Sequence, residues 1–240
     1  MVIHPRHGTG EDIKFLGCHI DCQLNMQSHI EYLLQICRPK IKAMLRTRGL
    51  YDLPTMLQQF KTHIWSIIEH HNGSLRHATA TLLARLDGLQ VSFLDELQIT
   101  EDAAFVNYNF APLGLRRDIG ILGFLHKRVL GLCHPGICKF LPMAAGAAWH
   151  NRPLKTFDHV CTTNRRMFER SIFYMIHVYN RLPQYLIDCC SVSAFQKQLT
   201  QIAKHRCIAG DDEWASCFHS CSNLWRWRME LPYQTVVVAA

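Results

Sequence analysis

Residues 14–42 read KFLGCHIDCQLNMQSHIEYLLQICRPKIK, and the hydrophobic period changes within this stretch. Around "IKFLGCHID" apolar and polar residues alternate, as they do along a half-buried strand. From Met26 onward apolar residues recur every three or four positions, as they do on one face of a helix. They are Met26, Ile30, Leu33, Leu34, Cys37, Ile41, Met44 and Leu45. The stretch therefore predicts a short strand that leads into a long helix.

The residues before this stretch complete a β-hairpin in our interpretation. "VIHP" (2–5) supplies a first strand, "RHGTGED" (6–12) supplies a turn with two glycines, and "IKFLGCHID" (13–21) supplies the second strand. Gly17, inside the second strand, predicts a bulge or a close approach of backbone.

The predicted long helix has a basic second half. Its exposed side reads "RPKIKAMLRTR" and contains no acid. The cations are Arg38, Lys40, Lys42, Arg46 and Arg48. Pro39 is expected to kink or divide the helix, and Gly49 is expected to end it as a C-terminal cap.

The rest of the chain reads as further helices. We expect a second helix from Pro54 to the "HHNG" at 70–73, a third over 74–97 and a fourth from Thr100, whose side chain is a candidate N-cap. Others are expected over 111–132, 170–189 and 191–207, with Pro183 as a break and a serine cap before the last. The class predicted is mainly α, with one hairpin at the start.

Composition narrows the class of protein. The 240 residues are 48% hydrophobic, so a buried core is expected, and the formal charge of +7 favours acidic partners such as nucleic acid. Eleven cysteines at irregular spacing, after a polar N-terminus, indicate reduced thiols of an intracellular protein, in nucleus or cytoplasm. No apolar run reaches the length of about 20 residues that a membrane span needs, so no membrane partner is expected.

Metal and catalytic motifs give weak signals. The nucleophile elbow, the phosphate-binding loop and the dinucleotide fingerprint are absent from the sequence. Two groups have Cys and His close together: Cys207, Cys217, His219 and Cys221, and Cys133, His134 and Cys138. The spacing of Cys217, His219 and Cys221 fits neither a zinc knuckle nor a zinc ribbon, and the second group is loose, so scattered packed thiols are the preferred interpretation and no metal or other cofactor is expected.

Clusters of acidic and of basic residues also allow two interpretations, a functional site or a solvated surface. Asp211, Asp212 and Glu213 lack a flanking apolar strand, which favours a solvated turn over a metal-binding carboxylate pair. The basic helix over 38–48 suits a phosphate backbone and a solvated face equally well. The same holds for two other groups: Arg116, Arg117, Lys127 and Arg128, and Arg165, Arg166 and Arg170.

"KFLGCHID" resembles the strand that follows the catalytic core in reverse transcriptases of non-LTR (LINE-like) retrotransposons. In that family an aromatic-Leu-Gly triplet lies in the primer-grip hairpin, and it matches Phe15, Leu16 and Gly17 here. The resemblance implies that the next helix, with its basic second half, is the thumb that grips the template–primer duplex. Arg38, Lys40, Lys42, Arg46 and Arg48 would then contact nucleic acid.

The resemblance extends past the thumb. "APLGLRRDIGILGFLHK" and "SIFYMIHVYNRLP" followed by "SVSAFQKQL" are similar to stretches that come in this order near the end of such polyproteins, and the matches cover most of residues 13–204. The implied segments are 1–24 (palm end and primer-grip hairpin), 25–70 (thumb-like helices), 71–132 (helical post-thumb region), 133–153 (loop), 154–209 (C-terminal helices) and 210–240 (unassigned, Trp-rich).

The departures from the family decide the expected activity. The acidic metal ligands of the family lie on a palm upstream of the triplet, and this sequence contains no counterpart of that palm. No catalytic residue is carried over, so the chain is expected to be a fragment without polymerase activity. Its expected partners are RNA or DNA template–primer, bound without sequence preference, and the upstream palm and fingers region of a parent polyprotein.

A second hypothesis comes from another class of protein. The chain would be a free-standing helical interaction domain whose basic faces bind acidic protein partners. In the tail, "LWRWRME" places Arg226 and Arg228 beside Trp225 and Trp227, which suits stacking on bases as well as packing on another protein.

Overall fold

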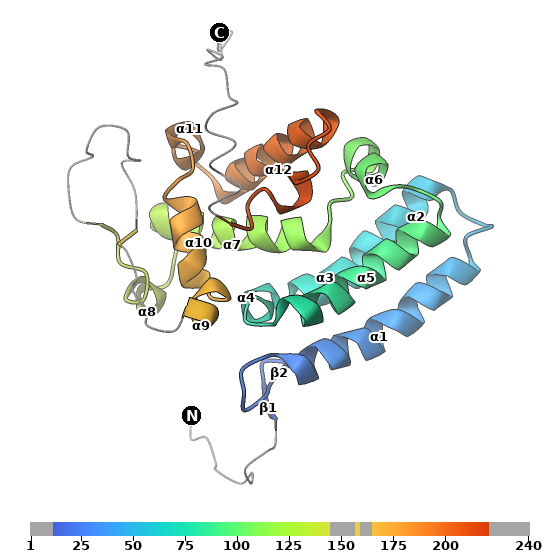
Figure 1. Ribbon diagram of the computed structural model, residues 1–240, viewed down its shortest axis with the longest axis horizontal. Coiled ribbons are helices and arrows are strands. Elements are labelled where there is room, and N and C mark those ends of the chain that lie inside the picture. The colour runs from blue at the N-terminus through green and yellow to red at the C-terminus, as the bar shows by residue number, and fades with distance from the viewer. Residues whose placement is uncertain (1–11, 145–156, 159–164, 221–240) are drawn as a thin grey trace. The chain divides into compact units, whose positions relative to one another are not determined.

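A computed structural model describes residues 12–144, 157–158 and 165–220. The chain forms two compact units, Met1–Arg117 with Thr162–Ile172, and Asp118–Cys161 with Phe173–Ala240. The structure is mainly helical with one two-stranded hairpin near the N-terminus, which confirms the predicted fold class (Figure 1). The finer division into six segments stays a prediction.

The hairpin is smaller than the sequence pattern indicated. Strands β1 (Ile13–Phe15) and β2 (Cys18–Ile20) are antiparallel, with Phe15 opposite Cys18. Leu16 and Gly17 between them have φ of 47° and 83°. Two successive left-handed residues form the tight turn that matches the twist of a hairpin. The prediction of one strand over 13–21 was therefore wrong, and "VIHP" lies outside the described residues.

Helix α1 (Gln27–Arg46) begins directly after this hairpin. The Asp21 carboxylate accepts hydrogen bonds from the backbone N–H groups of Gln23, Asn25 and Gln27, which orders the chain into the first turn. Seven residues of the helix are buried: His29, Ile30, Leu33, Leu34, Cys37, Ile41 and Met44. The predicted apolar face is confirmed, with a histidine added to it.

Two predictions about α1 were wrong. Pro39 does not divide the helix, because Pro39 and Gln35, whose carbonyl loses its N–H donor, both lie on the exposed side, where solvent can satisfy that carbonyl. Gly49 does not cap it, because the helix ends at Arg46 and the Thr47 hydroxyl donates to the Met44 carbonyl instead.

The first unit continues with α2 (Leu53–Phe60), a π-helical turn η1 (Lys61–Trp65), α3 (Ser66–Glu69), α4 (Asn72–Leu75), α5 (Ala80–Glu96) and α6 (Glu101–Tyr108), and also contains α9 (Arg165–Glu169). The third predicted helix starts at Ala80 and not at Ser74, because the Thr79 hydroxyl accepts the Leu82 N–H and fixes the N-terminus there. Thr100 caps α6 as predicted, through the Ala103 N–H.

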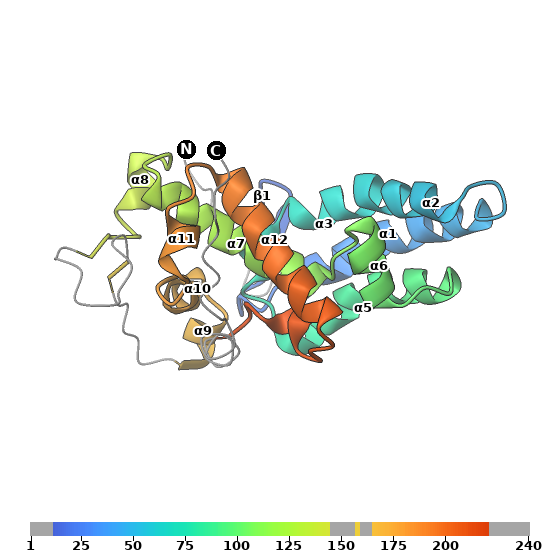
Figure 2. The ribbon, with the colours of Figure 1, turned by 90° about the horizontal axis from the view of Figure 1, so that it is seen from above.

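The core of this unit lies between α1, the continuous α2–η1–α3 rod and α5, which run side by side (Figures 1 and 2). Phe60 and Phe93 are fully buried with ring centroids 4.6 Å apart. Gln90 is buried among them because both of its polar ends are satisfied: it accepts from the Trp65 indole N–H at 3.0 Å and donates to the Ala111 carbonyl at 3.0 Å.

The second unit contains most of α7 (Leu113–Val129) and of α10 (Ile172–Tyr179). It also contains α8 (Pro135–Cys138), α11 (Gln184–Ile187), α12 (Val192–Ile208) and the 3₁₀ turn η2 (Trp214–Ser216). His126 of α7 lies at its centre. Its Nε2–H donates to the Cys189 carbonyl, its Nδ1 accepts from the Tyr179 hydroxyl, both at 2.9 Å, and its ring stacks on Phe195. Burial raises the pKa of Tyr179, which keeps this hydroxyl a donor.

The helix predicted over 170–189 is two helices in the structure. Pro183 is the N-cap of α11, so the break at this proline separates α10 from α11 and does not lie just before α12, where it was predicted. The Ser191 hydroxyl accepts the Ala194 N–H and caps α12, as predicted. The cysteines in the described ranges are all free thiols. Within those ranges no helix is long and apolar enough to cross a membrane.

Phe93→Ala tests the aromatic core of the first unit. We expect the free energy of unfolding to fall by about 3–5 kcal/mol, because a fully buried ring is lost and the surrounding helices close the cavity only in part. Denaturant titration measures it. Val91→Ala, an exposed position of the same helix, should change the value by less than about 0.5 kcal/mol, and equal effects would contradict this packing.

Candidate nucleic-acid interface

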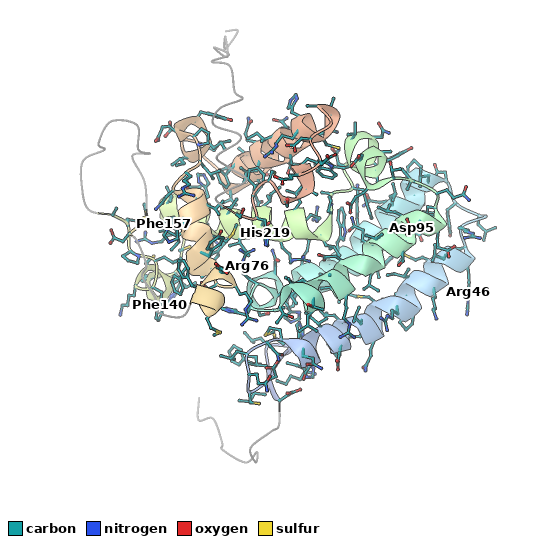
Figure 3. The ribbon with its side chains drawn as sticks, viewed as in Figure 1. Arg46, Arg76, Asp95, Phe140, Phe157 and His219 are labelled. Carbon is teal, nitrogen blue, oxygen red and sulfur yellow. The ribbon has the colours of Figure 1, made fainter. Side chains whose placement is uncertain are left out.

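A basic stripe lies along the exposed face of α1. Arg38, Lys42 and Arg46 follow one another at four-residue intervals and are all exposed, so their Cα atoms are about 6 Å apart along the helix. Lys40 is exposed on the flank of the helix. None of the four has a carboxylate partner in the part of the chain that the structure describes. Figure 3 labels Arg46, the last residue of the stripe.

Arg48 differs from these four. It lies beyond the end of α1 and forms an ion pair with Glu96 of α5, Nη1 to Oε2 2.7 Å. The sequence showed no acid near it, because Glu96 is 48 residues away and only the packing of α5 against α1 brings it there. Its charge is thus partly neutralised, although both side chains are about half exposed.

The basic groups elsewhere in the first unit hold the fold together. Arg116 pairs with Glu69, and its guanidinium carbon lies 3.7 Å from the centre of the Trp65 ring. Arg117 makes two contacts of 2.6 Å with the Asp87 carboxylate. The Arg117 guanidinium is buried and that of Arg116 is partly buried, so these paired groups are structural and do not form a phosphate-binding face.

The other residues of the predicted basic groups are likewise either engaged in contacts within the fold or exposed. In the second unit, Arg128 donates from Nε to the Leu141 carbonyl, whereas Lys127 is exposed. Arg170 donates to the Met167 sulfur. The side chains of Arg165 and Arg166 lie outside the described residues. The sequence left phosphate contact and a solvated face equally open for each basic group. Within the described residues of the first unit, the group on α1 is the one that remains available for phosphate contact.

The primer-grip triplet forms the end of the hairpin. Phe15 and Leu16 are 51% and 80% exposed. Gly17 lies in a turn and not in the predicted strand bulge, and the group close to it is a side chain: a Cβ on Gly17 would lie 3.3 Å from Nε2 of His71. The same Nε2–H donates to the Leu16 carbonyl at 3.3 Å. An imidazole therefore holds the turn from the helical side and leaves its apolar side chains in solvent.

The hairpin turn lies near the start of α1, and the basic stripe lies on the second half of the same helix. The hairpin contacts the start of α1 through His29, and Arg46 lies 17 residues further along the same helix. At 1.5 Å per residue this separation is about 25 Å, the axial length of about seven base pairs. Lys40 follows His29 by three helical turns and so lies on the hairpin side of α1.

Three histidines lie where the hairpin meets the helices. His29 is fully buried, and its Nδ1 accepts from the His19 backbone N–H at 3.4 Å. Burial, and then the neighbouring His71 and His19, lower the pKa of His29 from 6.5 to about 4. Burial also lowers the pKa of His71. Neither histidine could be identified from the sequence, since an isolated His on an apolar face carries no signal of its own.

The candidate metal ligands do not assemble into a site within the described residues, where no group of three or more Cys, His, Asp or Glu side chains can hold an ion. Cys217 is buried, which raises the pKa of its thiol to about 12. His219 pairs with Asp118 at 3.2 Å, and Asp211 with Arg206. Cys221 lies outside the described residues.

A hollow of about 800 Å³ lies where the C-terminal ends of α1 and α5 meet the start of α2. Its lining contains Arg48 with its partner Glu96, and also Asp95, which Figure 3 labels. Two carboxylates against one guanidinium make the hollow unsuited to phosphate. It marks the end of the basic surface.

The comparisons with known proteins give no relative: no family model, no curated protein and no solved structure matches this chain.

Gly17→Ala tests the geometry of the turn. We expect it to destabilise the first unit by about 1–2 kcal/mol, because alanine is strained at φ 83° and its Cβ would press on His71. Gly49→Ala is the matched control: Gly49 has no left-handed φ and open space around it, so alanine should be neutral or stabilising. Denaturant titration compares them, and an equal response would contradict the turn.

Proposed function

We propose that this chain is the C-terminal part of a reverse transcriptase of the non-LTR retrotransposon type, without the catalytic palm. In this proposal β1 and β2 are the primer grip at the palm end, and α1 is the thumb. The chain binds RNA or DNA template–primer without sequence preference and has no polymerase activity by itself.

The observation that carries the proposal is the uncompensated stripe on α1. Arg38, Lys42 and Arg46 remain exposed and without carboxylate partners among the described residues, while Arg116 and Arg117 of the same unit are paired with Glu69 and Asp87. A spacing of about 6 Å per cation suits a phosphate backbone, which such a row binds through charge alone. The exposed Leu16–Gly17 turn, at the other end of the same helix, is part of the triplet on which the resemblance rests.

The proposed lack of polymerase activity rests on the resemblance and on the residues that the family uses. Its metal-binding aspartates precede the aromatic-Leu-Gly strand, and residues 1–14 of this sequence contain only Glu11 and Asp12 as acids. The adjacent Asp211 and Asp212 offer no substitute, because Asp211 is paired with Arg206 and accepts the Glu213 N–H in a turn after α12. Two-metal phosphoryl transfer needs carboxylates that are directed at the ions.

The hairpin also supports the proposed upstream partner. Ile13, Phe15 and Leu16 are exposed apolar side chains, and within the described residues the outer edge of β1 is unpaired. Such an edge is a template for another strand. A palm sheet from the parent polyprotein would cover both the edge and the apolar side chains.

A second candidate function rests on exposed apolar side chains, which each unit has. In the second unit Leu132, Ile137 and Phe140 are exposed within nine residues, and Figure 3 labels Phe140. Exposed apolar clusters of this kind mark protein contacts. A helical interaction domain that binds acidic proteins would use these clusters together with the basic faces.

Replacing Arg38, Lys40, Lys42, Arg46 and Arg48 with Gln tests the interface. We expect affinity for every primer–template to fall alike, and the slope of log affinity against log salt to flatten by about 3 to 4, since each phosphate contact contributes about 0.9 and Arg48 is partly neutralised. Fluorescence anisotropy over a salt series measures both values.

The matched control replaces Lys127, Lys139 and Lys197, exposed lysines of the second unit, with Gln. It should leave the salt slope nearly unchanged. Glu96→Gln sharpens the comparison, because it releases Arg48 and should strengthen binding. Unchanged affinity in the five-residue variant would show that α1 is not the interface, and tight binding of an acidic protein without affinity for nucleic acid would favour the second function.

The origin is tested by reading the genomic DNA upstream of the Met1 codon in all three forward frames. A palm with an aspartate pair, intact or broken by stops, is the expected result. Unrelated non-coding sequence with its own promoter would favour the interaction domain.

A further inference from the structure

The geometry points to a latch on the hairpin: we infer that His29 and His71 are positioning residues that hold the Leu16–Gly17 turn against the helices, and that protonation of these two imidazoles releases it. The latch itself stands on contacts within the first unit. Its consequence for nucleic acid rests on the proposed function.

Two imidazoles and one thiol attach the hairpin to the helices. His29 accepts the His19 N–H with Nδ1, which places the proton of its neutral ring on Nε2. His71 donates from Nε2 to the Leu16 carbonyl. Between these points the Cys18 thiol donates to the Ser74 hydroxyl at 3.3 Å. Every one of these attachments uses the backbone or the inward face of the hairpin, and opening also separates the His19 and Tyr32 rings and the apolar contacts of Cys18 and Ile20.

Protonation of His29 removes its hydrogen bond to the hairpin, and protonation of His71 adds a charge beside its own hydrogen bond to the hairpin. A proton on Nδ1 of His29 turns the acceptor of the His19 N–H into a second donor. Nε2 of His29 and Nδ1 of His71 are both buried without a hydrogen-bond partner in the described residues, so an added charge finds no acceptor there. The two ring centroids are 4.5 Å apart, and two imidazolium ions at this distance repel.

The groups around the pair do not compensate such charges. From β1, Lys14 lies over the Tyr32 ring at 5.9 Å; β2 contributes His19 and the Cys18 thiol; the chain before α4 contributes His70, whose ring is 4.6 Å from His71. These neighbours are neutral or cationic. Asp21, the first acid after β2, already accepts three backbone N–H groups at the start of α1.

The direction of the pH effect follows from these surroundings. The pKa of His29 is lowered from 6.5 to about 4, and that of His71 is lowered as well, so the latched state favours neutral rings. The latched state is therefore most stable above pH 6.5 and loses stability as the pH falls from 6.5 to about 4. The equilibrium constant for opening rises about tenfold for each pH unit below 6.5. Over the window down to about pH 4, the open population therefore increases by up to about 300-fold.

Three cysteines of the first unit report the opening. Cys18 is buried under the hairpin, Cys22 is exposed, and Cys37 is fully buried in the core. The full chain is treated with dithiodipyridine, which labels thiols in acid as well as at neutral pH, and the sites are quantified by peptide mass. We expect the rate at Cys18, relative to Cys22, to rise by about 100-fold or more from pH 7 to pH 4, with Cys37 protected throughout.

Non-titrating side chains test the two positions. His29→Asn keeps an acceptor near the place of Nδ1, and His71→Gln keeps an N–H near the place of Nε2, so the double variant should lose the rise at Cys18. His63→Asn, an exposed histidine outside the cluster, should keep it. A flat Cys18 rate in the wild-type protein, or labelling of Cys37 in step with Cys18, overturns the latch. If Cys37 of the double variant is labelled at neutral pH, the core of that variant is open. The labelling rates of the wild-type protein then test the latch by themselves.

A binding measurement separates the latch from the proposed function. With a labelled primer–template at fixed salt, the loss of affinity between pH 7 and pH 5 should be larger in the wild-type chain than in the double variant. No affinity at either pH, together with acid-dependent labelling of Cys18, leaves the latch and rejects the nucleic-acid function. Equal losses in both chains, with Cys18 labelled in acid, show that the turn does not contact the nucleic acid and reject that part of the inference.

Discussion

The structure of the first unit depends on the one-sided burial of α1. Its apolar face packs on α5 and on the α2–η1–α3 rod, and Ile30, Leu33 and Cys37 are fully buried there. Burial on one side leaves the other side to solvent along the whole helix. Because Pro39 lies on that exposed side, the helix stays continuous and presents an uninterrupted surface.

The packing that buries one face of α1 also determines what its charges can do. When α5 packs alongside, Glu96 meets Arg48 and partly neutralises the C-terminal end of the basic surface, while Arg85 approaches Glu31, an acid near the start of α1. The middle, from Arg38 to Arg46, receives no such partner in the described residues. A face that is uniformly basic in the sequence thus becomes a stripe with defined ends.

At the start of α1 a polar side chain is buried in the core. A polar ring, His29, occupies a core position, and it is tolerated because the neutral imidazole can accept the His19 N–H. The hairpin gains an attachment that depends on the protonation state of one side chain. In the second unit His126 is equally buried, but both of its nitrogens have partners, so it serves as a structural centre.

The sequence by itself determined the helical class, the buried face of α1 and the caps at Thr100 and Ser191, because these follow from local periodicity and from side chains that bond to backbone three residues away. It also located the triplet 15–17, but not its conformation, since a left-handed Leu16 is stabilised only by the paired strands and by His71. Tertiary structure alone decided which cations are paired and which histidines meet. Those contacts join residues 30 to 55 positions apart, and no local pattern records them.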